Sequence, residues 1–438
     1  MMHGYLPFDK DGNQIAAFRT WRNTNSREAS AELTELFQFN IPERWSIAHL
    51  YQSILEKMDH VNKIDFFTTL AGYIHWQLTG QKVLGIGDVA GMFPVDSETM
   101  DYRRDLIEKF NQKVSQYNYP WKLEQLLPKC LCAGDDAGKL TEEGAKRLDK
   151  DGDLVAGIPL CPPEGDAGTG MVATNSVKIR TGNVSAGTSI FAMIVLEKSL
   201  KKLHREIDNV TTPDGHQVAM VHANNCTSDI NAWVKLFSEF SKLSGHPVSN
   251  DQLFPMLFNE ALKGENDCGG IMNYGYYSGE FITGLSEGRP MLIRTPDSNF
   301  TIGNLMRSNL YTSLGAVRLG MDILTDEGVK IDKLLGHGGL FKTEIVGQQI
   351  MADALKTPVW VMTTAGEGGA WGIAVLAAFL SNRKNGQSLP DFLDETIFCG
   401  SEGSKRDPEE NGMKGFDTFI KRYVDCLPVE GLATEKLK

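Results

Sequence analysis

The stretch Pro163-Glu164-Gly165-Asp166-Ala167-Gly168-Thr169-Gly170 is the part of the sequence from which the fold and the chemistry can be worked out. Its glycines lie around Asp166, where they let the backbone turn sharply and let a ligand approach the carboxylate without a Cβ wall. Gly-Asp is also ordinary turn chemistry, so the same residues fit a purely structural turn. Asp166 is therefore a candidate catalytic base with a structural alternative.

A second stretch, Thr181-Gly182-Asn183-Val184-Ser185-Ala186-Gly187-Thr188-Ser189, has the pattern of a strand, a tight turn and the start of another strand. β-Branched residues on both sides favour the strands. The small residues around Gly187 and Thr188 offer backbone N–H groups that could hold phosphate oxygens. Together the two stretches predict a base beside an anion cradle.

Length and composition bound the protein class. A chain of 438 residues exceeds the size at which a single core stops growing, which predicts two domains. The net charge of −12, from 44 basic and 56 acidic residues, argues against nucleic acid or an anionic membrane as the main partner. The sequence has no apolar run of membrane-spanning length and no signal-peptide pattern, so we expect a cytoplasmic protein.

The seven cysteines are sparse and lack a C-x-x-C pair, which is typical of reduced thiols. Cys130 and Cys132 could form a redox or metal pair. A one-residue gap between apolar neighbours on an expected strand favours core packing instead.

The rest of the chain alternates helical and strand patterns. Residues 5–21 predict an opening hairpin, near which His3 and Trp21 could hold a polyol. An amphipathic helix begins at Ser228, with Phe240 and Leu243 expected on its apolar face. The βαβ-like passage 333–380 indicates α/β layers. We place a first domain at residues 1–172 and a second at 173–438.

Two further glycine turns precede helical patterns, at residues 335–339 and 366–372. The first predicts free N–H groups and a positive helix end where a nucleotide could rest, although it is neither a Walker A loop nor a G-x-G-x-x-G fingerprint. Tight helix packing explains each turn equally well when it is taken alone. Three such turns in one α/β half favour a nucleotide site, and Arg180, Lys342 and Arg383 are the cations nearest to them in sequence.

With these motifs in place, the chain resembles the FGGY carbohydrate kinases, and most of all their xylulokinase-like members. The matching motifs, in chain order, are Met2-His3-Gly4, Trp21-Arg22-Asn23, the run from Ala156 through Asp166, Ser185 to Ser189, Gly336 to Gly339, and Gly366 to Ala378. The resemblance covers nearly the whole chain. It implies an actin-like ATPase (ribonuclease H-like) fold, with a sugar-binding and a nucleotide-binding α/β domain and a cleft between them.

The resemblance also implies residue roles. Asp166 would accept the proton of a sugar hydroxyl while ATP, with Mg²⁺ bridging its phosphates, donates the phosphoryl group. The residues implied at the sugar are Met2, His3, Trp21 and Asp166. The residues implied at ATP are Gly187, Thr188, Gly338, Gly339 and Lys342.

Three departures from the family pattern stand out. Ala167 replaces a frequent Asn or Gln, and Asn23 replaces a frequent Asp, so we expect altered sugar contacts. The family's first phosphate loop has no counterpart in the sequence. We expect that loop to precede Met1, and expect the chain as given to bind sugar better than it phosphorylates it.

Two other functions remain open from sequence: a catalytically impaired sugar or nucleotide sensor, and an actin-like ATPase acting on protein partners. The sugar-side motifs disfavour the second of these. The sequence does not choose among xylulose, ribulose, fuculose or another ketose. It leaves the oligomeric state open, with a homodimer as one expectation.

Overall fold

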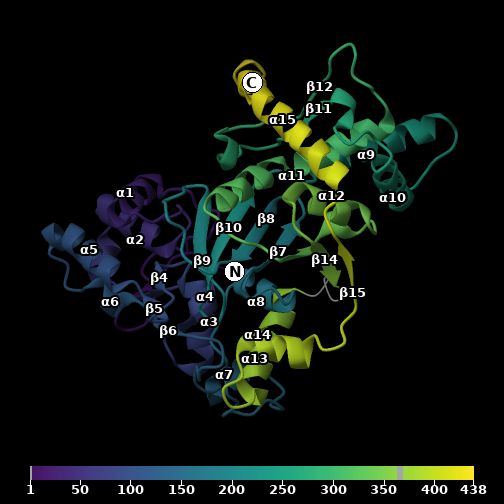
Figure 1. Cartoon of the computed structure of the whole chain (residues 1–438). Helices are drawn as coiled ribbons and strands as arrows, with labels where there is room; N and C mark the ends of the chain where they lie inside the picture. The colour runs from purple at the N-terminus through teal and green to yellow at the C-terminus, as the bar shows by residue number, and fades with distance from the viewer. Residues whose placement is uncertain (1, 363–367) are drawn as a thin grey trace. The chain divides into compact units, whose positions relative to one another are not determined.

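The structure is a computed structural model that describes residues 2–362 and 368–438, and its chain divides into two compact units (Figure 1). The first unit consists of Met1–Ile179, Val195–Ala219 and Glu367–Gly400. The second consists of Arg180–Ile194, Met220–Gly366 and Ser401–Lys438. The assignment of sugar binding to residues 1–172 and of nucleotide binding to residues 173–438 stays a prediction.

The first unit is mainly helical, with short strands. Its helices are α1 (Arg27–Phe37), α2 (Ser46–Leu55), α3 (Leu70–Thr79), α4 (Ile86–Val89), α5 (Arg104–Val114), α6 (Leu123–Leu126), α7 (Glu142–Leu148), α8 (Asp166–Ala173), α13 (Gly369–Asn382) and α14 (Leu389–Phe392), the last followed by a π-helical turn, Leu393–Ile397. Its short strands are β1 (Leu6–Phe8), β2 (Phe66–Thr68), β3 (Val83–Gly85), β4 (Val95–Asp96), β5 (Asp101–Tyr102) and β6 (Lys129–Leu131). Two 3₁₀ turns cover Asp59–Lys63 and Ser115–Tyr117.

The second unit contains most of the main sheet and the long helices. The strands of the sheet are β7 (Thr181–Ala186), β8 (Ile190–Val195), β9 (Ile207–Thr211), β10 (Gln217–Ala223), β13 (Lys333–His337), β14 (Val359–Met362) and β15 (Gly403–Arg406). The helices of the unit are α9 (Ser228–Leu243), α10 (Asn250–Ala261), α11 (Ile302–Asp326), α12 (Val346–Leu355) and α15 (Glu410–Lys436). A hairpin pairs β11 (Met272–Tyr274) with β12 (Met291–Ile293), and 3₁₀ turns cover Cys268–Gly270, Phe281–Thr283 and Gly339–Phe341.

The seven-stranded sheet has the order β15-β14-β13-β7-β8-β10-β9. β13 lies parallel to both β7 and β14, while β8 and β15 run antiparallel to their neighbours β7 and β14. This arrangement confirms the predicted strand, turn and strand at 181–195 and the predicted strand at 333–339. The helix predicted from Lys342 begins only at Val346, because a 3₁₀ turn comes first.

The opening segment is only partly the hairpin that the sequence predicts. Isolated antiparallel bridges join Tyr5 to Arg19 and Phe8 to Gln14. The regular strand β1 pairs instead with β2, and Phe8 and Phe66 bury their rings between the two strands and neighbouring aromatic residues. The pairing partner of the first strand therefore comes from a later part of the first unit.

The predicted apolar face of α9 is wrong in part. Ile230 and Val234 are buried as expected, but Phe240 is 68% exposed and Leu243 is 87% exposed. The buried side of the helix is completed by two small residues, Ser238 and Ser241. The short side chains let the helix lie close to its support, and Phe240 and Leu243 lie on the outer side.

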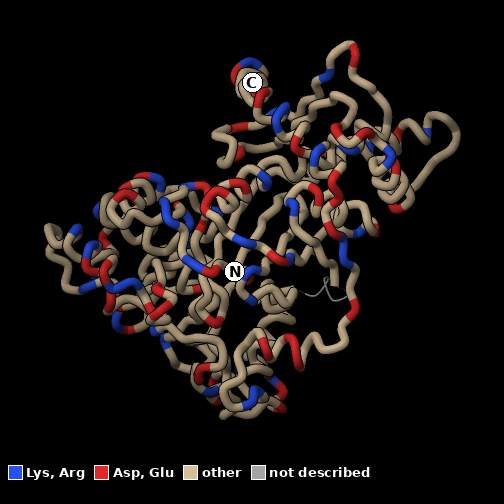
Figure 2. The backbone as a smooth tube through the Cα atoms, viewed as in Figure 1, with Lys and Arg blue, Asp and Glu red and all other residues tan. Residues whose placement is uncertain are grey.

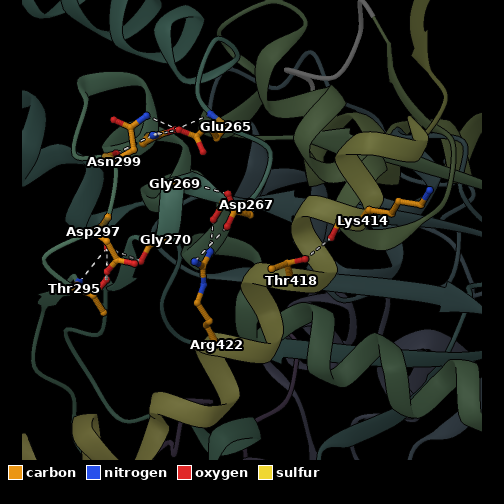
Figure 3. A network of polar contacts seen from close by, with 12 residues as sticks. Glu265, Asp267, Gly269, Gly270, Thr295, Asp297, Asn299, Lys414, Thr418 and Arg422 are labelled. Carbon is orange, nitrogen blue, oxygen red and sulfur yellow. Dashed lines mark hydrogen bonds and ion pairs between the residues drawn. The ribbon is translucent and has the colours of Figure 1, made fainter.

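A polar network fixes the loop between α10 and β11 (Figure 3). The carboxylate of Asp267 accepts a hydrogen bond from the Gly269 N–H at 3.1 Å and pairs with Arg422 of α15 at 3.4 Å. Cys268 and Gly269 both have positive φ there, so the backbone turns sharply. The network joins α15 to the loop before β11 within the second unit.

Acidic and basic residues are interspersed along the chain (Figure 2). Among the described residues, no helix combines the length and apolarity that crossing a bilayer requires.

Helices α8 and α13 of the first unit touch backbone to backbone. A Cβ on Gly372 would lie 2.0 Å from the carbonyl oxygen of Thr169, and one on Gly369 would lie 2.9 Å from its hydroxyl. Only glycine at 372 allows this approach. The contact holds α8, whose first residue is Asp166, in place.

Gly372→Ala should therefore destabilise the protein by about 1–3 kcal/mol, because the methyl group would overlap the Thr169 carbonyl. The matched control is Gly170→Ala, also in a helix, where a Cβ would meet nothing within 4 Å. That control should be neutral or stabilising by up to about 1 kcal/mol. Denaturant unfolding of both variants measures the difference, and equal stabilities would contradict the close contact.

Candidate functional site

Asp166 begins a helix and does not lie in a turn as the sequence predicts. It is the first residue of α8, after the N-cap Gly165, and its side chain is exposed. Its Oδ1 accepts a hydrogen bond from the backbone N–H of Met2 at 2.8 Å. A carboxylate at a helix N-terminus is stabilised by the helix dipole. The structure thus presents Asp166 in a fixed position with its charge supported.

Met2 and His3 lie beside this carboxylate and are both 5% exposed. The His3 Nδ1 donates a hydrogen bond to the Gly91 carbonyl oxygen at 3.2 Å, and the ring stacks on Trp45 with 6.4 Å between ring centroids. Burial, helped by the charge of Arg44, lowers the pKa of His3 to about 3. The imidazole is therefore neutral at physiological pH and acts as a hydrogen-bonding group.

Trp21, the third predicted sugar residue, is 46% exposed. The guanidinium of Arg22 lies 4.9 Å from the centroid of its ring. An exposed indole face suits stacking on a sugar ring. Its place in a sugar site remains a prediction, whereas Met2, His3 and Asp166 are brought together.

Sequence reasoning missed two acids next to Asp166. Asp88 is fully buried and accepts a hydrogen bond from the Thr69 hydroxyl at 2.6 Å. Glu164 is buried and accepts one from the Gly87 N–H at 3.1 Å. Burial raises the pKa of Asp88 to about 7 and the pKa of Glu164 well above its usual range. The spacing Gly85-x-Gly87-Asp88 is the sequence pattern that could have pointed to this pair of acids.

In the second unit, Gly187 and Thr188 form the turn between β7 and β8. The Gly187 carbonyl accepts hydrogen bonds from the Thr227 N–H at 3.1 Å and the Thr227 hydroxyl at 2.7 Å, and the Thr188 carbonyl accepts one from the Cys226 N–H at 3.0 Å. The turn is therefore tied to the residues that precede α9. Because the Gly187 and Thr188 carbonyls both accept hydrogen bonds, the orientation of the turn is fixed.

Gly187 does not offer the free backbone N–H that the sequence predicts. Its φ lies outside the left-handed region, and its N–H donates to the Ser189 carbonyl at 2.9 Å. A Cβ at this position would meet only the Ser189 oxygen, at 4.0 Å. Gly187 therefore leaves open space in front of the turn and does not serve to adopt an unusual backbone conformation.

The other predicted nucleotide residues lie next to this turn. Gly338 has φ +103° and approaches β7 so closely that a Cβ would lie 2.5 Å from the Ala186 carbonyl oxygen. A Cβ on Gly339 would meet only that same oxygen, at 4.0 Å. Lys342 is exposed, and its N–H donates to the Gly339 carbonyl at 3.2 Å. The structure thus joins the 187–188 and 338–339 turns and places Lys342 after them.

The remaining glycine turn is described in part. Gly366 and Glu367 lie outside the described residues, and Gly369 to Asn382 form α13. In the described part, Gly372 serves helix packing against Thr169. Of the described residues, no three His, Cys, Asp or Glu side chains gather as a group that could hold a metal ion.

Known proteins resemble this chain over nearly its whole length. Residues 182–381 match the C-terminal domain of the FGGY family of carbohydrate kinases. The xylulose kinase of Haemophilus influenzae is 23% identical over 438 aligned positions, covering 97% of this chain and 82% of that protein.

Solved structures share the fold. A ligand-bound xylulose kinase from Lactobacillus acidophilus gives a TM-score of 0.78 at 13% identity, covering all of this chain and 84% of the other. A gluconate kinase from the same organism gives a TM-score of 0.76 at 14% identity, with the same coverage. These similarities confirm the predicted actin-like ATPase fold.

Proposed function

As this chain belongs to the FGGY family of carbohydrate kinases, we propose that it transfers the γ-phosphoryl group of ATP to a hydroxyl of a ketopentose such as xylulose. The observation that carries the proposal is the exposed carboxylate of Asp166, fixed at the start of α8 and hydrogen-bonded to the Met2 N–H. The xylulose kinase similarity over 97% of the chain supports the ketopentose. Because the relatives are kinases, they favour a kinase over the sensor alternative.

In the proposed mechanism Asp166 accepts the proton of the attacking hydroxyl. A sugar hydroxyl is a poor nucleophile at neutral pH, so a carboxylate within hydrogen-bonding reach assists its attack. Neutral His3 and the nearby backbone groups orient the sugar, and exposed Trp21 provides a face on which the sugar can stack. Transfer through a loose transition state needs positioning and charge stabilisation more than covalent help.

The nucleotide residues fit ATP as substrate. Cβ atoms at Gly187 and Gly339 would each meet only one backbone oxygen, at 4.0 Å, so both glycines leave backbone open to close approach by phosphate oxygens. Lys342 supplies a nearby positive charge. Mg²⁺, when bound, would neutralise phosphate charge, and we propose that the phosphate oxygens hold it.

The experiment that tests this function is a screen for sugar-dependent ADP release. The panel should contain xylulose, ribulose, fuculose, glycerol and gluconate, with calorimetry of the same compounds in the absence of ATP. We expect the fastest turnover with a ketopentose. Faster turnover with gluconate would contradict the ketose assignment, and sugar binding without any ADP release would favour the sensor.

Asp166→Asn tests the proposed base. The amide keeps the size of the side chain but cannot accept the proton, so kcat should fall by about 10²- to 10⁴-fold while sugar affinity changes little. The control is Asp153→Asn, an exposed acid of the same unit, which should leave kcat unchanged. An unchanged kcat in the Asp166 variant would mean that Asp166 has only a structural role.

Gly187→Val tests the proposed phosphate turn. Because a Cβ there has open space, the variant should fold normally, yet its branched side chain would occupy the position we assign to ATP oxygens. Affinity for ATP, measured by calorimetry, should drop sharply, and less so for Gly187→Ala. Equal ATP affinity in all three proteins would mean that the phosphates bind elsewhere.

A further inference from the structure

Two buried carboxyl groups, those of Asp88 and Glu164, lie close to Asp166. They come from two segments that cross: residues 85–88 and residues 163–166. Glu164 Oε2 and Asp88 Oδ1 are both buried without a hydrogen-bond partner. Buried polar atoms of this kind are uncommon and call for an explanation.

The crossing depends on glycines. Glu164 fits under Gly85 and Gly87, since Cβ atoms there would lie 2.3 Å from its Oε1 and 2.6 Å from its Oε2. In return, Asp88 Oδ1 lies against Gly165, where a Cβ would be 2.9 Å away. Each carboxyl therefore contacts the backbone of the other segment. Gly165 is followed directly by Asp166, so the pair sets where α8 begins.

The surroundings of the pair do not supply a compensating cation from the described residues. Asp88 accepts the Thr69 hydroxyl and is influenced electrostatically by Asp166 and Tyr102, and Glu164 acts electrostatically on the thiols of Cys130, Cys132 and Cys161. Two neighbouring buried carboxyl groups cannot both be ionised at low cost. A proton on one of them removes this conflict.

We propose that Glu164 is a neutral carboxylic acid in the folded protein at neutral pH and, with Asp88, positions Asp166 for proton transfer. This inference rests on the role proposed above for Asp166. Glu164 Oε1 accepts the Gly87 N–H, which leaves Oε2 to carry the proton. The raised pKa of Glu164, caused first by burial and then by the Asp88 charge, agrees with this assignment.

The pair also makes stability depend on pH. The pKa of Asp88 is about 7 in the folded chain, above the ordinary value of about 3.9 that applies to the unfolded chain. Between these values the folded chain binds a proton that the unfolded chain releases. Glu164, which also keeps its proton in the folded chain, adds a second proton to this difference. Stability should therefore fall as pH rises through this window, with a slope set by up to about two protons.

The first experiment detects the protonated acid without using activity. An infrared difference spectrum of parent minus Glu164→Gln at pH 8, where Asp88 is mostly ionised, should show the carbonyl band of a carboxylic acid. No such band would overturn the proposal. A melting temperature that K⁺ or Mg²⁺ raises in the parent but not in this variant would also overturn it, because a cation would then replace the proton.

The second experiment follows melting temperature from pH 5 to pH 8. The parent should lose stability as pH rises, and Asp88→Asn should lose less. Glu142→Gln, an exposed acid of the same unit, is the control and should follow the parent. Equal slopes for the parent and Asp88→Asn would overturn the titration of the pair.

The third experiment tests positioning of Asp166. Glu164→Ala should lower kcat roughly 10- to 100-fold through misplacement of the base, with the KM for ATP unchanged. Glu164→Gln, which imitates the neutral acid, should keep most of kcat. An alanine variant as fast as the parent would overturn the positioning role. If the parent phosphorylates no sugar, the proposed function fails, and the first two experiments still decide the protonation.

Discussion

The position of Asp166 depends on one steric constraint, the contact between the backbones of α8 and α13 at Thr169 and Gly372. No side chain separates the two helices there, so α8 cannot shift without moving a helix from the C-terminal half of the chain. On its other side, the segment leading into α8 is crossed by residues 85–88. Asp166 is thus exposed to solvent yet held from two directions, as the role of base proposed for it would require.

The second unit also contains a close backbone contact that a glycine permits. Gly338 lets the end of β13 approach the Ala186 carbonyl, and this contact joins two turns that are far apart in sequence. Thr227 then holds the carbonyl of Gly187 through both its N–H and its hydroxyl. In each unit, glycine permits a close backbone approach and hydrogen bonds fix its direction. The open faces of Gly187 and Gly339 are therefore available for a ligand because other contacts already define the turns.

Local patterns predicted the parts of the fold that local energetics decide. The β7–β8 hairpin follows from β-branched residues around a turn of small residues. The helix at Asp166 could not be predicted, because Gly168 and Gly170 disfavour helix and its support comes from Gly372. Periodicity located α9 but gave the wrong burial for Phe240, since it does not reveal that serines face the support. Sequence motifs singled out Asp166, His3 and Met2 as candidate site residues, while Glu164 was missed because burial of an acid depends on a distant segment.

The charges around Met2 and His3 bear on which acceptor the proposed sugar site would bind. His3 is neutral, and the charge of Arg44 is paired with the carboxylate of Asp208. Beside Met2 lies the charge of Asp166, which accepts the Met2 N–H, and Asp88 adds a second negative charge above about pH 7. A neutral ketose can donate hydrogen bonds to such a site, whereas a sugar acid would bring a further negative charge into it. On the assignment proposed above, this charge balance would favour a neutral polyol over gluconate as acceptor, although the xylulose kinase and gluconate kinase structures share the fold.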